Sequence, residues 1–170
     1  DEVIVLTDHR MERSNRNGEW MRTLPLPRAN PDGMYDHTVI GENSLVVDEA
    51  AEALYLVQGY QIIRIDLADH NASVLFRQSY ADLGPLIRHG DALYLLMHSS
   101  LEDRYRLHQA TYSDAEFDFY TQIVRLDMHD WSIRRYLVEG YYHALELGEY
   151  DGNNNSSSHE PAFILQRYSN

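Results

Sequence analysis

Histidines and carboxylates at two expected turns are the side chains whose types and spacing could do chemistry here. The chain has nine His in 170 residues, and neutral imidazole with carboxylate is a workable ligand set for Zn²⁺ or Fe²⁺. We take His89, Asp91 and His129 as candidate metal ligands. Further loop residues that could join them are His98, His108, Asp130 and His143. No spacing matches a known ligand signature such as His-Glu-x-x-His, so solvated turn histidines are the competing interpretation, and we expect no cofactor.

A second set of charged residues occurs twice. Arg64 and Asp66 recur as Arg125 and Asp127 within matching stretches. Residues at i and i+2 of a β-strand lie on one face, so each Arg is adjacent to its Asp. A catalytic pair is normally needed once, so the repetition favours a structural ion pair, which at a surface contributes about 0–1 kcal/mol.

The composition excludes several classes of chemistry. The absence of Cys removes disulfides, thiol nucleophiles and thiolate metal sites. No Gly-x-Ser-x-Gly elbow and no Gly-rich phosphate loop is present. Paired carboxylates for glycoside hydrolysis remain an open alternative, because their separation is spatial.

The charge also bears on partners. The formal net charge is −13, and all 14 basic residues are Arg. No basic stripe is visible, so we expect no nucleic-acid partner. No apolar run approaches the roughly 20 residues that a membrane-spanning helix needs, so we expect no membrane span.

An internal duplication indicates which elements must position these residues. Ala-Leu-Tyr-Leu occurs at 53–56 and again at 92–95, and Gln-Ile-Ile-Arg-Ile-Asp at 61–66 is matched by Gln-Ile-Val-Arg-Leu-Asp at 122–127. In the first copy Ile63, Ile65 and Leu67 alternate with other residues, and this period of two is typical of a β-strand. The order of the two motifs is the same both times, so the sequence predicts two copies of one four-stranded repeat, at 44–78 and 85–138.

The expected strands are short and separated by turn residues. In the first repeat they are 44–47, 53–58, 61–67 and 73–78, and in the second they are 85–88, 92–98, 122–128 and 132–138. Partial repeats are expected at both ends, from strands 3–7, 19–26 and 37–40 and from strands 142–147 and 162–168. A chain of this length favours one domain, residues 1–170.

The second repeat carries an insertion at 99–120. Ser100 with Asp103 resembles a helix capping box, so we expect one short helix there. Long inserted loops on β scaffolds commonly carry binding. The candidate ligand-binding residues are Tyr105, His108, Phe117, Phe119 and Tyr120. The alternative is a lid that packs on its own repeat.

The repeat pattern resembles a known family. Leu54-Tyr-Leu, residues 62–67, Ser73-Val-Leu and residues 86–95 together look like the blade pattern of bacterial TolB-like and related lipoprotein propellers, over residues 44–140. The resemblance implies an all-β fold of antiparallel four-stranded blade-like repeats, as a partial β-propeller or an open β-meander. Two full and two partial repeats are too few for a usual ring, so exposed edge strands are expected, which pair readily with another chain or with further blades.

The function expected from these features is a non-catalytic binding or interaction module of a β-propeller-type protein, with a protein or small-molecule ligand. Amphipathic Tyr, of which the chain has 13, suits binding faces. One alternative is a propeller-type hydrolase or lyase that uses loop His and carboxylates, and another is a structural piece of a larger propeller. We expect an extracytoplasmic location, secreted or periplasmic.

Overall fold

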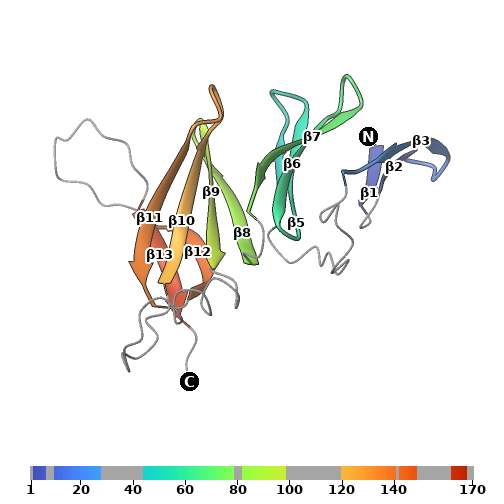
Figure 1. Ribbon diagram of the computed structural model, residues 1–170. Helices are drawn as coiled ribbons and strands as arrows, with labels where there is room; N and C mark the ends of the chain where they lie inside the picture. The colour runs from blue at the N-terminus through green and yellow to red at the C-terminus, as the bar shows by residue number, and fades with distance from the viewer. Residues whose placement is uncertain are drawn as a thin grey trace. The chain divides into compact units, whose positions relative to one another are not determined.

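The protein is all-β, as predicted. The computed structural model describes residues 2–6, 10–27, 44–78, 82–98, 120–140, 142–148 and 162–167, and the regular structure in these ranges consists of antiparallel strands (Figure 1). The helix expected in the insertion falls outside the described residues. The chain forms two compact units, residues 1–79 and 80–170.

The first unit begins with a three-stranded sheet of order β1-β2-β3. Its strands are β1 (Glu2–Leu6), β2 (Arg10–Asn15) and β3 (Trp20–Pro25). The sequence pattern does not predict β2, because Met11 is the one apolar residue of this strand and no alternation is visible. The strand expected at 37–40 lies outside the described residues.

The first full repeat forms a four-stranded meander, as predicted. Its strands are β4 (Leu45–Asp48), β5 (Ala53–Gln58), β6 (Gln61–Asp66) and β7 (Asn71–Arg77), in that spatial order. In the β5–β6 ladder Leu54 is opposite Ile65 and Leu56 is opposite Ile63. Directly opposed residues share a face, so these four aliphatic side chains form one apolar surface.

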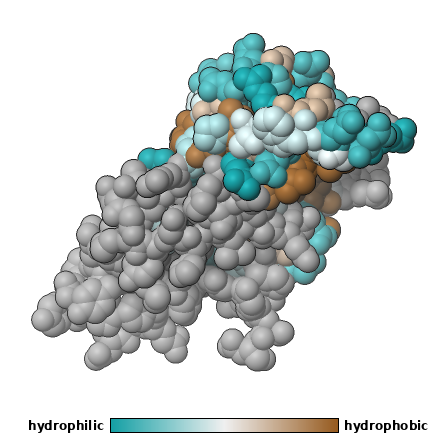
Figure 2. Space-filling view, turned by 90° about the vertical axis from the view of Figure 1, so that its right-hand side faces the viewer, coloured by the Kyte–Doolittle hydropathy of each residue, from teal (hydrophilic) through white to brown (hydrophobic). Residues whose placement is uncertain are grey.

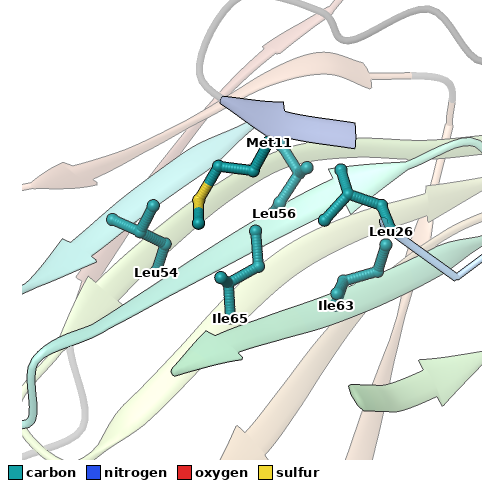
Figure 3. Close-up of a cluster of buried hydrophobic side chains, with 6 residues drawn as sticks. All are labelled: Met11, Leu26, Leu54, Leu56, Ile63 and Ile65. Carbon is teal, nitrogen blue, oxygen red and sulfur yellow. The ribbon is translucent and has the colours of Figure 1, made fainter. Parts of the chain in front are cut away.

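That surface packs on the three-stranded sheet. Met11 of β2 and Leu26, just after β3, lie against the aliphatic side chains of β5 and β6 (Figure 3). The buried cluster consists of Met11, Leu26, Leu54, Leu56, Ile63 and Ile65. Two sheets apolar on facing sides exclude water from each other, which supplies the main stabilisation of this unit.

Two polar connections fix the sheets of the first unit. The Arg13 guanidinium donates to the Leu67 carbonyl at 3.1 Å and lies 3.0 Å from His70 Nδ1. At the other end of the strands, the buried Gln61 amide donates to Gln58 Oε1 at 3.2 Å and to the Pro27 carbonyl at 3.0 Å. Hydrogen bonds of this kind allow polar groups to be buried without a large desolvation cost.

The second unit contains a second copy of the meander. Its four-stranded meander consists of β8 (Asp82–His89), β9 (Ala92–His98), β10 (Tyr120–Asp127) and β11 (Ile133–Glu139). A two-stranded sheet follows, of β12 (Tyr142–Gly148) and β13 (Ala162–Arg167). The duplicated motifs therefore occupy matching strands, β5 with β9 and β6 with β10.

A second apolar cluster joins these two sheets. Its buried members are Ala92, Tyr94, Leu96, Ile123 and Leu145, with Phe163 and Leu165 packed against them. The rings of Tyr94 and Phe163 lie 4.9 Å apart in a tilted arrangement, which is a favourable aromatic contact. Each unit is thus a four-stranded sheet with a smaller sheet against one face, but the covered face differs, since Tyr94 aligns with Tyr55 and not with Leu54 or Leu56.

Candidate functional site

The repeated Arg–Asp pairs lie at the turns that connect the third and fourth strands of each meander. In the first unit, Arg64 Nη2 lies 3.1 Å from Asp66 Oδ2. The other carboxylate oxygen accepts the backbone N–H groups of Ala68 at 3.0 Å and Asp69 at 2.9 Å. The N–H of Asp69 is the main reason that the pKa of Asp66 lies below its usual value, and Arg64 lowers it further against the opposing effect of burial.

The second unit has the same arrangement. Arg125 Nη2 lies 3.0 Å from Asp127 Oδ2, and Asp127 Oδ1 accepts the backbone N–H of His129 at 3.0 Å. That N–H and the Arg125 guanidinium lower the pKa of Asp127. Burial opposes the charge on Arg125, but hydrogen bonds with Tyr94 and Asp127 outweigh it and raise the pKa of the guanidinium.

The two turns also share their backbone geometry. His70 and Trp131 occupy matching positions and have positive φ angles of 54° and 59°. A left-handed residue at this position lets the chain reverse into the last strand of the sheet. Because each carboxylate is engaged by the turn it precedes, the Arg–Asp pairs act in folding the turns.

The structure brings together two of the three candidate metal ligands. His129 Nε2 lies 3.3 Å from Asp91 Oδ2, and the two turns are joined by the Met128 N–H, which donates to the Asp91 carbonyl at 2.9 Å. The side chains of His129 and Asp91 are 77% and 72% exposed. His89 lies at the end of β8 and is exposed, outside this pair.

A metal ion needs a larger ligand set than this pair. Within the ranges that the structure covers, no group of three or more His, Asp or Glu side chains lies close enough to hold a metal ion. Two exposed groups can form a solvated ion pair, and binding of a metal at His89, Asp91 and His129 stays a prediction.

The other histidines and acids of the expected loop cluster have different positions. His98 is buried at 6% exposure, and its Nε2 lies 2.5 Å from the Tyr142 carbonyl, where β9 meets the start of β12. Asp130 Oδ1 accepts the backbone N–H of Ser132 at 2.8 Å, which lowers the pKa of Asp130. His98 is therefore a buried link between two sheets, and Asp130 belongs to a turn.

The aromatic residues expected to bind a ligand fall mostly in the insertion. Tyr105, His108, Phe117 and Phe119 lie outside the described residues. Tyr120 is the first residue of β10, opposite Glu139. Their role in binding stays a prediction.

One surface of the first unit was missed by sequence reasoning. Leu45 and Val47 of β4 are 41% and 55% exposed, although they lie opposite the buried Leu56 and Leu54 on the face that carries the apolar cluster. Figure 2 shows hydrophobic residues reaching the surface beside hydrophilic ones on one side of the molecule. The signal in the sequence was the unbroken apolar run Leu-Val-Val at 45–47, which has no polar residue to mark a solvent face.

No protein-family model, curated protein or solved structure matches the chain. In the described ranges, no helix has the length and apolar character needed to cross a membrane.

Proposed function

We propose that the chain is a non-catalytic interaction module of a β-propeller-type protein, with a protein or small molecule as ligand. The observation that carries this proposal is the structural role of the two repeated Arg–Asp pairs. Asp66 and Asp127 accept backbone N–H groups of their own turns and pair with Arg64 and Arg125. Their role in both repeats is accounted for by folding, whereas Leu45 and Val47 on β4 are exposed aliphatic side chains of the kind that suits contact with a partner.

The propeller-type assignment is supported by the stacking of the sheets. Each unit places a four-stranded meander face to face with a second antiparallel sheet through an apolar cluster. A blade cannot bury both faces alone, so stacking of this kind is what blades require. We place the protein outside the cytoplasm on the resemblance of its repeats to exported lipoprotein propellers.

One observation favours the second candidate, a propeller-type hydrolase or lyase. His129 and Asp91 form a His–carboxylate pair at the loop end of a rigid sheet, and such pairs serve in general acid–base catalysis. Their exposure argues against this role, because catalytic pairs gain strength where water is excluded.

The two candidates are separated by an activity screen paired with a binding screen. The chain and its Asp91→Asn/His129→Gln variant are assayed on nitrophenyl glycosides, esters and phosphates and on polyuronates, with and without added Zn²⁺. We expect rates equal to those of buffer for both proteins, together with ligand-induced shifts of the thermal transition in a small-molecule and peptide library. Turnover by the chain that is lost in the variant would contradict the interaction module and support the hydrolase or lyase.

A further inference from the structure

Two exposed polar side chains follow the turn between β6 and β7. Asn71, Ala72 and Ser73 begin β7 and form an Asn-x-Ser tripeptide, the acceptor pattern for N-linked oligosaccharides. Such a tripeptide is common by chance, so its surroundings decide whether it can be modified. Asn71 and Ser73 are both exposed, and neither side chain forms a hydrogen bond with the described residues.

The two polar side chains share one side of the strand. Ala72 packs against the apolar cluster of the first unit. Because successive residues of a strand face opposite ways, Asn71 and Ser73 both face away from that cluster. The acceptor amide and the hydroxyl that the transferases recognise are therefore presented together, and an oligosaccharide attached there leaves the cluster undisturbed.

The backbone of this segment can be drawn into a transferase without unfolding the sheet. β7 ends the described sheet, so a single ladder holds it. Asn71 is opposite Asp66 in the last pair of that ladder, and a register shift separates Val74 from Phe76. The tripeptide thus lies in a short piece of ladder between a turn and a bulge. Strand ends of this kind open locally at a free energy far below that of global unfolding.

The residue two positions before Asn71 completes a longer pattern. Bacterial oligosaccharyltransferases commonly require an acidic residue there, and Asp69 occupies this place in the sequence Asp-His-Asn-Ala-Ser at 69–73. The Asp69 side chain is exposed and has no hydrogen bond or ion pair with the described residues. The two other Asn-x-Ser tripeptides of the chain, which begin at 154 and 155, have Gly152 and Asn153 at this place.

The equivalent turn of the second unit folds without the pattern. There Ser132 takes the place of Asn71. Asp130, which aligns with Asp69, accepts the backbone N–H of Ser132 at 2.8 Å. The acid is used within the turn in one copy, whereas in the other it is exposed beside an unused amide. Folding of the turn therefore does not account for the tripeptide.

We propose that Asn71 is an N-glycosylation site. The Nδ2 atom of Asn71 forms a bond to C1 of the first sugar of an oligosaccharide that is carried on a lipid pyrophosphate. The bond between C1 and the pyrophosphate oxygen breaks, the lipid pyrophosphate leaves, and Nδ2 loses one proton. The inference goes beyond the interaction module and rests on the proposed extracytoplasmic location, since this transfer takes place outside the cytoplasm.

The test incubates the purified, folded chain with a bacterial oligosaccharyltransferase that requires the acidic residue and with its lipid pyrophosphate-linked oligosaccharide. Mass spectrometry of the proteolysed chain locates the sugar. The variants are Asn71→Gln, Ser73→Ala and Asp69→Asn, and the matched control is Asn17→Gln, at an exposed Asn outside any Asn-x-Ser or Asn-x-Thr tripeptide. A synthetic peptide of residues 67–75 establishes that the enzyme is active, and thermal unfolding establishes that each variant is folded.

We expect one oligosaccharide on Asn71 in the parent chain and in the Asn17→Gln control, and its loss in the three variants. Transfer to the peptide but not to the folded chain, transfer only at 154 or 155, or transfer that persists in Ser73→Ala overturns the inference. An unmodified Asn71 in the protein that its own cells export also overturns it. A protein that those cells keep in the cytoplasm contradicts the proposed location and the inference with it, whereas the library screen tests the interaction module independently of glycosylation.

Discussion

Gln61 and Gln122 begin the same duplicated motif, and we predict that replacing each with Leu has different consequences. Gln61 is fully buried. Its Oε1 accepts from Arg77 Nε at 3.2 Å and from Arg77 Nη2 at 2.5 Å, and its Nε2 donates to Gln58 and to the Pro27 carbonyl. Gln122 is half-buried, and its side chain has no hydrogen bond among the described residues.

The expected change in unfolding free energy follows from those contacts. Each hydrogen bond contributes about 1 kcal/mol net, so loss of the set around Gln61 costs about 4 kcal/mol. A buried Leu returns about 1–2 kcal/mol through the hydrophobic effect. The expected loss for Gln61→Leu is therefore about 2–3 kcal/mol of unfolding free energy, whereas Gln122→Leu is expected to change it by less than about 0.5 kcal/mol.

The assay is urea unfolding followed by circular dichroism, with the free energy extrapolated to water for each variant. Gln61→Met serves as a second variant, since it keeps the length and flexibility of the side chain while removing its hydrogen bonds. We expect it to lose nearly as much stability as Gln61→Leu. Equal losses at positions 61 and 122, or no loss with Gln61→Met, would refute the assignment of stability to this polar network.

Three further predictions use the same measurement. Leu56→Ala, at a fully buried position between the two sheets of the first unit, is expected to cost about 3–5 kcal/mol; a cost below that of an exposed Leu would contradict the packing. Gly90 has a φ of +55° with no atom within 4 Å of an added Cβ, so Gly90→Ala is expected to cost about 1 kcal/mol from backbone strain alone, and Gly90→Asn less. The backbone N–H groups of their turns lower the pKa of Asp66 and Asp127 in the folded state. The two carboxylates therefore stabilise the fold above the unfolded-state pKa of about 3.9, and this stabilisation is lost as the pH falls through the lower folded-state pKa values. The unfolding free energy measured from pH 7 to pH 2 is expected to show this loss, and the loss is expected to be smaller in Asp127→Asn. The same pH dependence in the variant and the parent chain would show that this turn does not contribute to acid sensitivity.

The local sequence pattern was sufficient to predict a strand where apolar residues occupy alternate or consecutive positions. The bounds of β5 and β9 agree with the prediction, and the other strands of the two repeats differ by a few residues at their ends. β2 was missed because its inward-facing positions include Arg13, whose guanidinium is satisfied by the Leu67 carbonyl. A polar strand of this kind is stabilised by partners far along the chain, which no short window contains.

The candidate site was predictable to a smaller degree. The Arg–Asp pairs followed from the period of two, since neighbours on one strand face need no tertiary information. The meeting of Asp91 with His129 depends on the pairing of β9 with β10, which closes two turns on the same end of the sheet. The burial of His98 could not be predicted, because it depends on where the chain enters β12.

The amino-acid sequence by itself determined the β class, the duplication and the turns, because side-chain alternation and turn chemistry act over a few neighbouring residues. The tertiary structure decided which copy of a repeated residue is buried and which is exposed. Identical glutamines differ in their surroundings. The smaller sheet also packs on opposite faces of the two meanders, on the face of Leu54 and Leu56 in the first unit and on the face of Tyr94 and Leu96 in the second. The physical reason is that burial and hydrogen-bond satisfaction are set by the sheet lying opposite, which is contributed by distant parts of the chain.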